Sequence, residues 1–308
     1  MYRILITGGS GFIGSHLVDR LTSNGHFVHV IDNRAGDPHF NANEGATYYN
    51  HDISDDSVIK LIQSIQPDFI FHLAAQIGEK SHLSSVSRDA EVNIIGTINI
   101  LEAAKLCHVR KLIFTSSSSI YGIPAYLGVD EAHPLCPKTP YGMSKRSAEE
   151  YIQLYARLYE LPYTILRLSS VYGTRQHMQS DGDMIAGFIH NYMHKQPVKV
   201  FGDGQQTRDF VFIEDVLDVL ELSLEKGTNH IFNIGSGHGT SINELINLLN
   251  ATFEIHVEPI YDTKTVVNMK ECYFDISQAL TLLDWSPRFD LADGILETVH
   301  YYRRTLRL

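Results

Sequence analysis

The chain has 308 residues, of which 44% are hydrophobic and 20% are charged, which is typical of one large globular α/β unit or two closely joined lobes. Its 25 Lys and Arg against 36 Asp and Glu give a net charge of −11, spread without long single-sign runs, which argues against a nucleic acid or an anionic membrane as the main partner. Three widely spaced cysteines favour a reducing compartment, and with no leader pattern or 18-residue apolar stretch we expect a cytoplasmic protein.

A strand, a glycine-rich turn and a helix follow one another at the start of the chain. The apolar run Ile4–Ile6 leads into Gly8–Gly14, which contains two overlapping glycine spacings, and a helical pattern begins at Phe12. Glycine allows positive φ and lets a pyrophosphate approach the backbone, while the helix N-terminus offers free N–H groups. The segment therefore predicts a dinucleotide phosphate site.

Strands and helices then alternate up to residue 168. We predict strands at 26–31, 47–50, 67–75, 111–115 and 163–168, and helices at 55–64, 89–107 and 141–159. This alternation predicts a Rossmann-type doubly wound parallel sheet in an α/β protein. The later part alternates less regularly, with strands expected at 198–201 and 208–213 and helices ending near 194 and at 215–226, 241–253 and 291–304.

The predicted elements divide the chain into two parts. We expect a dinucleotide-binding Rossmann domain at 1–168 and a smaller C-terminal α/β substrate lobe at 169–308, some segments of which pack back on the Rossmann domain. Open α/β sheets bind ligands at the carboxyl ends of their strands, so the lobe should add a substrate site at that edge.

Asp32 ends the second predicted strand. A carboxylate there would accept hydrogen bonds from the adenosine ribose hydroxyls and repel a 2′-phosphate, which favours NAD over NADP. Arg34 could instead pair with a phosphate, and a loop carboxylate without a ligand is the alternative interpretation.

Tyr141 and Lys145 are four residues apart in a predicted helix, so their side chains share one face. The ammonium, together with a nicotinamide cation, would favour the phenolate and lower the pKa of Tyr141 from about 10 towards neutrality, as a general base requires. Ser116–Ser119 follow the fifth strand, where they would face a cofactor; a solvated turn is the alternative.

Taken together, these segments resemble the extended short-chain dehydrogenase/reductases, and more narrowly the NAD-dependent nucleotide-sugar epimerase/dehydratase family. The likeness runs from residue 2 to about residue 297. It is carried by Thr7–Gly14, Asp32, Asp52–Ile53, His72–Gln76, Phe114–Gly122, Tyr141–Lys145 and Arg208–Asp215.

The resemblance implies which residues hold the cofactor. These are Gly8, Gly11, Phe12 and Ile13 at the pyrophosphate, Asp32 and Asn33 at the ribose, Asp52 and Ile53 at the adenine, then Leu73, Ala74, Ala75 and Asn93, with Tyr141 and Lys145 at the nicotinamide end.

The resemblance also implies the catalytic and substrate residues. Tyr141 would be the acid/base, Lys145 its electrostatic partner and Ser117 the catalytic serine. Arg208 would pair with the nucleotide diphosphate, for which a guanidinium fork is well shaped. The implied substrate-binding set is Ser117, Ser118, Tyr141, Ser170, Met184, Val200, Phe201 and Arg208.

The two positions that follow Ser117 distinguish the reactions that members of the family catalyse. Where dehydratases carry acids, and decarboxylases a nearby glutamate, this chain has Ser118 and Ser119. The resemblance therefore implies an NAD-dependent 4-epimerase acting through a transient 4-keto intermediate on a UDP-hexose, UDP-N-acetylhexosamine or UDP-uronic acid. A nucleotide-sugar 4-ketoreductase and a 4,6-dehydratase are the rival enzymes, and a non-catalytic dinucleotide sensor is a rival of another class.

Other residues bear on the oligomeric state, on metal binding and on the substrate site. The family's helices corresponding to 89–107 and 141–159 often form a dimer interface, so we expect a homodimer. We expect no metal, because the His190 and His194 pair has no acidic residue between its members. Ser170 stands where the family often has asparagine, and a second diphosphate-binding pair is not found within 261–270.

Overall fold

The computed structural model describes residues 1–34, 42–77, 86–176, 184–263 and 271–306. Their contacts form two compact units, which are described separately. The first contains Met1–Gly122, Leu135–Arg167 and Leu217–Phe232, and the second contains Ile123–Pro134, Leu168–Val216 and Asn233–Leu308. The chain passes from the first unit to the second between Arg167 and Leu168, while segment 123–134 belongs to the second unit and segment 217–232 to the first.

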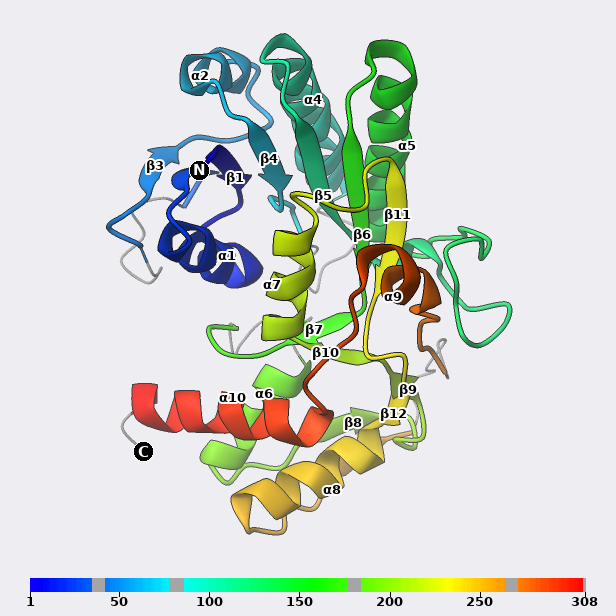
Figure 1. Cartoon of the computed structure of the whole chain (residues 1–308). Coiled ribbons are helices and arrows are strands. Elements are labelled where there is room, and N and C mark those ends of the chain that lie inside the picture. Colours follow the sequence, from blue (N-terminus) through cyan, green and yellow to red (C-terminus); the bar gives the residue numbers. More distant parts are fainter. Residues whose placement is uncertain (35–41, 78–85, 177–183, 264–270, 307–308) are drawn as a thin grey trace. The chain divides into compact units, whose positions relative to one another are not determined.

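A seven-stranded sheet has the order β11-β6-β5-β4-β1-β2-β3 (Figure 1). The pairings that link β3, β2, β1, β4 and β5 are all parallel. This order, with β1 beside β4 and the chain winding outward in both directions, confirms the Rossmann-type doubly wound sheet. The strands are β1 (Arg3–Thr7), β2 (Phe27–Asp32), β3 (Thr47–Asn50), β4 (Phe69–His72), β5 (Lys111–Ser117), β6 (Tyr163–Leu168) and β11 (His230–Ile234).

Helices cover both faces of the sheet. On one face α2 (Val58–Ile65), α4 (Gly96–Leu106) and α5 (Pro140–Tyr159) bury an apolar cluster against strand residues such as Leu5 and Leu112. The opposite face is covered by α1 (Phe12–Ser23) and α7 (Ile213–Leu222), which are joined by the ion pair between Arg20 and Asp218 at 2.9 Å (Figure 1). Alternate strand residues point to opposite faces of the sheet. Because helices cover both faces, the residues on both faces are buried and mostly apolar.

Two predicted elements are shorter or more broken than the sequence indicates. The expected strand 67–75 ends at His72, and the following residues leave the sheet. The expected helix 89–107 consists of α3 (Val86–Ala90), a π-helical turn (Glu91–Ile95) and α4. A π turn inserts one residue per turn and often marks a functional position. Apolar periodicity survives both changes, so it could not reveal them.

Within its described residues, the second unit contains three small strand pairs. β7 (Ser170–Tyr172) pairs with β10 (Phe210–Phe212), β8 (Lys199–Phe201) with β13 (Ile260–Asp262), and β9 (Thr207–Arg208) with β12 (Thr240–Ser241). Its helices are α6 (Met184–Met193), α8 (Ile242–Phe253), α9 (Ser277–Leu283) and α10 (Leu291–Leu306). Of the helices that the structure describes, none combines the length and apolar character needed to span a bilayer.

A buried carboxylate divides the strand that we predict at 208–213. Asp209 lies between β9 and β10 and accepts hydrogen bonds from the backbone N–H groups of Ser236, Gly237 and Phe274 at 2.6, 3.2 and 3.1 Å. Burial raises the pKa of Asp209, and these bonds oppose the rise. The single strand 208–213 is therefore wrong: β9 ends at Arg208 and β10 runs from Phe210 to Phe212, and the Asp209 side chain between them binds loop backbone.

Candidate active site

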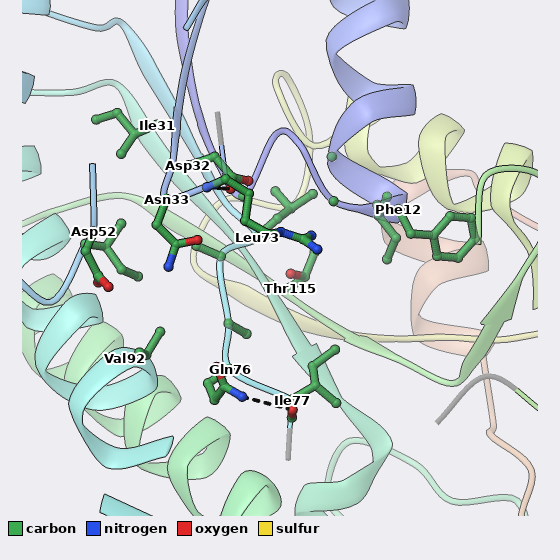
Figure 2. Close-up of a pocket in the computed structure, with 18 of the residues that line it drawn as sticks. Phe12, Ile31, Asp32, Asn33, Asp52, Leu73, Gln76, Ile77, Val92 and Thr115 are labelled. Carbon is green, nitrogen blue, oxygen red and sulfur yellow. Dashed lines mark hydrogen bonds between the residues drawn. The ribbon is translucent and has the colours of Figure 1, made fainter. Parts of the chain in front are cut away.

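A cavity of 660 Å³ lies at the carboxyl ends of β1, β2 and β4 in the first unit (Figure 2). Most of the residues that the resemblance implies for the cofactor line it, together with others that it does not name. The predicted lining residues are Gly8, Gly11, Phe12, Ile13, Asp32, Asn33, Asp52, Ile53, Leu73, Ala74 and Ala75; the additional ones include Arg34, His51, Gln76, Ile77, Val92 and Thr115.

Two glycines make the turn between β1 and α1 compact. Gly8 has φ +74°, and a Cβ atom there would lie 2.7 Å from the backbone nitrogen of Ala74. A Cβ atom on Gly14 would lie 2.1 Å from the carbonyl oxygen of Gly8. Any larger residue must therefore move the backbone, which explains the glycines at these positions. The turn brings the N-terminus of α1 to the cavity, where it can bind a phosphate.

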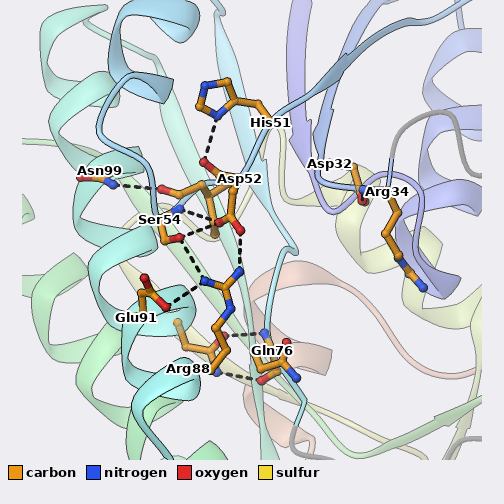
Figure 3. A network of polar contacts seen from close by, with 11 residues as sticks. Asp32, Arg34, His51, Asp52, Ser54, Gln76, Arg88, Glu91 and Asn99 are labelled. Atoms are coloured by element: carbon orange, nitrogen blue, oxygen red, sulfur yellow. Dashed lines mark hydrogen bonds and ion pairs between the residues drawn. The ribbon is translucent and has the colours of Figure 1, made fainter. Parts of the chain in front are cut away.

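Asp32 is buried and held by backbone donors. Its carboxylate accepts hydrogen bonds from the N–H groups of Ser10 at 3.0 Å and Arg34 at 2.9 Å. Figure 3 shows Asp32 and Arg34 side by side at the end of β2. The backbone bonds fix the carboxylate at the cavity wall, where it can accept further hydrogen bonds from a ribose.

A network of polar contacts holds Asp52 at another part of the cavity wall (Figure 3). Its carboxylate accepts hydrogen bonds from Ser54 N and Oγ at 2.9 and 2.7 Å and forms an ion pair with Arg88 at 2.5 Å. Burial opposes ionisation, but the bonds from Ser54 and Arg88 lower the pKa of Asp52 to about 2. Arg88 also pairs with Glu91 at 2.8 Å. Asp52 is therefore a fixed anion at neutral pH.

Asn93 does not line the cavity but fastens its wall to α5. Its Oδ1 accepts from Gln76 N at 2.7 Å, and its Nδ2 donates to Gln76 O and to Ser144 Oγ, each at 2.9 Å. Ser144 Oγ donates in turn to the carbonyl of Tyr141 at 2.9 Å. The π turn carries the Asn93 side chain to this position.

The catalytic candidates Ser117 and Tyr141 come together beyond β5. α5 begins after Thr139, whose side chain accepts a hydrogen bond from Gly142 N at 3.0 Å. A hydrogen bond joins the Tyr141 and Ser117 side chains. Ser117 Oγ also accepts from Ser119 N at 3.2 Å and from Ser119 Oγ at 2.9 Å. Ser118 begins the short 3-10 turn that follows.

Lys145 is buried one turn after Tyr141. Its ammonium lies 4.1 Å from the centre of the Phe114 ring. Burial lowers the pKa of Lys145 to about 7, against the attraction of Glu149. A second buried base, His72, has its pKa lowered to about 3 by burial and by Lys145.

The pKa of Tyr141 differs from the expectation. Burial raises it to about 12, Asp89 adds to the rise, and the bond to Ser117 opposes it. The protein groups alone therefore do not produce the lowering that we predict with a bound nicotinamide cation. Asp89 is buried on α3, a position from which the sequence gives no sign of contact with Tyr141.

The substrate residues implied beyond residue 168 lie in the second unit. Ser170 begins β7, where its N–H donates to Asp209 O at 2.9 Å, and Met184 begins α6. In β8, Val200 is buried and Phe201 is half exposed. Arg208 is mostly buried in β9; burial lowers its pKa, and its Nη1 donates to Thr207 O at 2.7 Å.

Other sequence expectations can be placed only in part. Residues 264–270, most of the segment searched for a second diphosphate-binding pair, lie outside the described residues. The rings of His190, on α6, and His194, in the turn that follows it, are 4.3 Å apart. Across the described ranges, no three His, Cys, Asp or Glu side chains are grouped so that they could hold a metal ion.

Comparison with known proteins identifies the family. The model of the "NAD dependent epimerase/dehydratase family" matches residues 4–235. A protein of Methanocaldococcus jannaschii named "Putative UDP-glucose 4-epimerase" is 41% identical, covering 99% of each chain. The crystal structure of UDP-glucose 4-epimerase with UDP-glucose from Thermotoga maritima is 38% identical, has a TM-score of 0.93, and covers 98% of this chain and 99% of its own.

A relative of different activity is also similar. UDP-glucuronic acid decarboxylase 1 of Xenopus tropicalis is 30% identical, over 99% of this chain and 73% of its own. The matches extend over both units. The glycine turn between β1 and α1, Asp32 at the end of β2, and Tyr141 and Lys145 on α5 all lie in the matched region. The chain therefore belongs to the NAD-dependent epimerase/dehydratase family and is an epimerase whose cofactor is NAD.

Proposed function

We propose that this chain is a UDP-sugar 4-epimerase that oxidises and re-reduces the sugar at C4. The observation that carries the proposal is the hydrogen-bonded pair Ser117 and Tyr141 with buried Lys145 one turn further along α5. A phenol that can exchange a proton with a sugar hydroxyl, a serine that can hold the same oxygen and a cation beside them are the groups that this chemistry requires.

NAD occupies the 660 Å³ cavity in this proposal. The glycine turn and the start of α1 hold the pyrophosphate through backbone N–H groups, Asp32 binds the adenosine ribose, and Asp52 lies at the adenine. Bound there, NAD supplies a reversible acceptor for the hydrogen on C4. The fit rests on backbone: a side chain at Gly8 would collide with the backbone of Ala74, and one at Gly14 with the carbonyl of Gly8.

The protein groups have separate roles in the proposed reaction. Tyr141 takes the proton of the C4 hydroxyl, while Ser117 holds the C4 oxygen by a hydrogen bond. Lys145 stabilises the phenolate by its charge and binds the nicotinamide ribose. When the 4-keto sugar has turned over, C4 regains its hydrogen on the opposite face and Tyr141 returns the proton to the C4 oxygen. The cofactor is then unchanged, and no net oxidation occurs.

The residues after Ser117 support epimerisation over the other reactions of the family. Elimination and decarboxylation need an acid or base near C5 and C6, and Ser118 and Ser119 offer only hydroxyls there. In the second unit Arg208 is proposed to bind the diphosphate, with Ser170, Met184, Val200 and Phe201 beside the nucleotide. A ketoreductase would use the same three catalytic groups but would consume reduced cofactor.

A panel of UDP-sugars tests the proposed function. Purified protein is incubated with UDP-glucose, UDP-N-acetylglucosamine and UDP-glucuronic acid without added reduced cofactor, and the sugars are separated. We expect one or more 4-epimers and no net change in the near-ultraviolet absorbance of reduced NAD. In a separate incubation with a nucleotide 4-keto sugar and added reduced NAD, stoichiometric loss of reduced cofactor, with no epimer formed in the panel, would show a ketoreductase instead. A pentose product would show a decarboxylase.

We also propose that the protein is a homodimer formed through α4 and α5. Large apolar side chains are exposed at the end of α4, where Leu106 lies, and along α5, among them Leu154, Leu158 and Tyr159. An exposed apolar patch of this kind marks a protein interface. Light scattering should give twice the chain mass of 34.8 kDa. The variant Leu154→Arg/Leu158→Arg should give the monomer mass, and a monomeric parent protein would contradict the proposal.

A further inference from the structure

A buried ion pair lies behind the catalytic candidates and has no role in the chemistry proposed above. Arg167 Nη2 and Glu149 Oε2 are 2.8 Å apart, and their side chains are only 3% and 1% exposed. Arg167 Nε also donates to both carboxylate oxygens, at 3.2 and 3.3 Å. The guanidinium and carboxylate therefore meet in a fork-like geometry that fixes both side chains.

The pair connects the two segments that carry the catalytic groups. Glu149 is on α5, one turn after Lys145 and two turns after Tyr141. Arg167 is on β6 and donates from Nη1 to Tyr121 Oη at 2.8 Å, with its guanidinium 5.1 Å from the ring centre. Tyr121 is buried immediately after the 3-10 turn that begins at Ser118. The contacts thus join α5 to the segment of Ser117 through β6.

Stability alone does not account for this arrangement. Removing two charges from water is costly, and replacing a buried ion pair by apolar side chains of similar size is often neutral or stabilising. By contrast, the ion pair between Arg146 and Glu150 on the same helix is exposed to solvent, as most ion pairs are. Its atoms are 3.0 Å apart and its side chains are 36% and 63% exposed. A buried pair in this place calls for another explanation, such as fixing geometry or charge.

The charge of Glu149 also acts on Lys145. The groups that face the Lys145 ammonium are Glu149 on α5, His72 on β4 and the Phe114 ring on β5. Tyr141 is faced by Ser117 and by Asp89 on α3. Of the groups facing Lys145, Glu149 is the anion, so it favours the ammonium form that burial disfavours. Arg167 holds that carboxylate in one position.

We propose that Arg167 and Glu149 are positioning residues for the epimerase reaction, which fix Ser117 relative to α5 and hold a carboxylate one helical turn from Lys145. The inference rests on the proposed function. Neither residue contacts the reacting atoms; Arg167 acts through Tyr121 and Glu149, and Glu149 acts through Lys145. Small misplacement of catalytic groups is enough to lower turnover strongly.

The test is the double variant Glu149→Met/Arg167→Met, which removes both charges and keeps an apolar filling. We expect it to fold and to bind NAD, but to lower kcat by about 100-fold with little change in KM, as expected for misplaced catalytic groups. Loss of the Glu149 carboxylate lowers the pKa of Lys145, so the ammonium is lost at lower pH. The high-pH limb of the kcat profile should therefore move to lower pH.

The matched control is Arg146→Met/Glu150→Met, which removes an exposed pair of the same charges from the same helix. Its kcat and pH profile should equal those of the parent. If Glu149→Met/Arg167→Met also has the parent's kcat and pH profile, the inference is overturned while the proposed function stands. If the double variant does not fold, Glu149→Gln removes the charge with unchanged size; it should show the same pH shift, and a parent-like profile overturns the inference.

A parent that epimerises no UDP-sugar would contradict the proposed function separately. In that case the role of the Arg167 and Glu149 pair is tested by the affinity for NAD, measured by fluorescence titration at a series of pH values. We expect this affinity to fall at lower pH in the double variant than in the parent, because Lys145 loses its proton earlier. Identical pH dependence in the two proteins would overturn the role of the pair in this case too.

Discussion

Tyr141→Phe should retain NAD and lose turnover by about 10²–10⁴-fold, the usual contribution of a general acid–base group. The substitution removes one hydroxyl and leaves a ring of the same shape at the start of α5, so the helix and the cofactor cavity should persist. The hydroxyl is the atom that bonds Ser117 and would take the C4 proton. Product separation after incubation with the accepted UDP-sugar measures the loss, and NAD released on denaturation measures retention.

Tyr151→Phe is the matched control for this experiment. Tyr151 is on the same helix but partly exposed, so removal of its hydroxyl should leave turnover unchanged. Unchanged turnover in Tyr141→Phe would contradict the acid/base role of Tyr141. Loss of bound NAD together with turnover would show instead that the phenol supports the cofactor site.

Arg167→Met as a single substitution should lower the free energy of unfolding by about 3–5 kcal/mol, the usual cost of leaving one member of a buried ion pair uncompensated. The Glu149 carboxylate would remain 1% exposed without its guanidinium. Denaturant unfolding followed by circular dichroism, with NAD in excess, measures the change. The double substitution with Glu149→Met should recover most of the loss, because no charge is then left buried.

The exposed Arg146 supplies the comparison for stability. Arg146→Met breaks a solvent-exposed pair and should cost no more than about 1 kcal/mol. A cost for Arg167→Met as small as this would mean that water reaches Glu149, and the description of the pair as buried would then be wrong.

The sequence predicts the sheet well where pattern and chemistry agree. Apolar strands followed at once by helical periodicity specify β1 to β6, and the glycine turn and Asp32 mark the cavity because backbone requirements at those positions allow few residues. All of these signals are local. Strand 47–50 and strand 163–168 have the predicted bounds for the same reason.

Features that depend on distant partners could not be predicted in this way. β11 is a five-residue strand that is recognised only by its place beside β6. Asp209 interrupts a good strand pattern because loops 236–237 and 274 bring donors to it. Arg167 and Glu149 are 18 residues apart, and only the fold places them together. The effect of Asp89 on Tyr141 likewise arises from packing, so the direction of the pKa shift was inaccessible from spacing.

The amide of Asn93 substitutes for a missing neighbouring strand. Beyond His72 the chain departs from the ladder, which would normally leave a peptide group without partners. Asn93 offers one acceptor and one donor with the same spacing as a peptide, and both groups of Gln76 bond to it. A sheet can therefore open its end to admit a dinucleotide while the backbone N–H and C=O of Gln76 both stay hydrogen-bonded. The side chain that closes the ladder also bonds Ser144, so widening of the opening would be transmitted directly to α5.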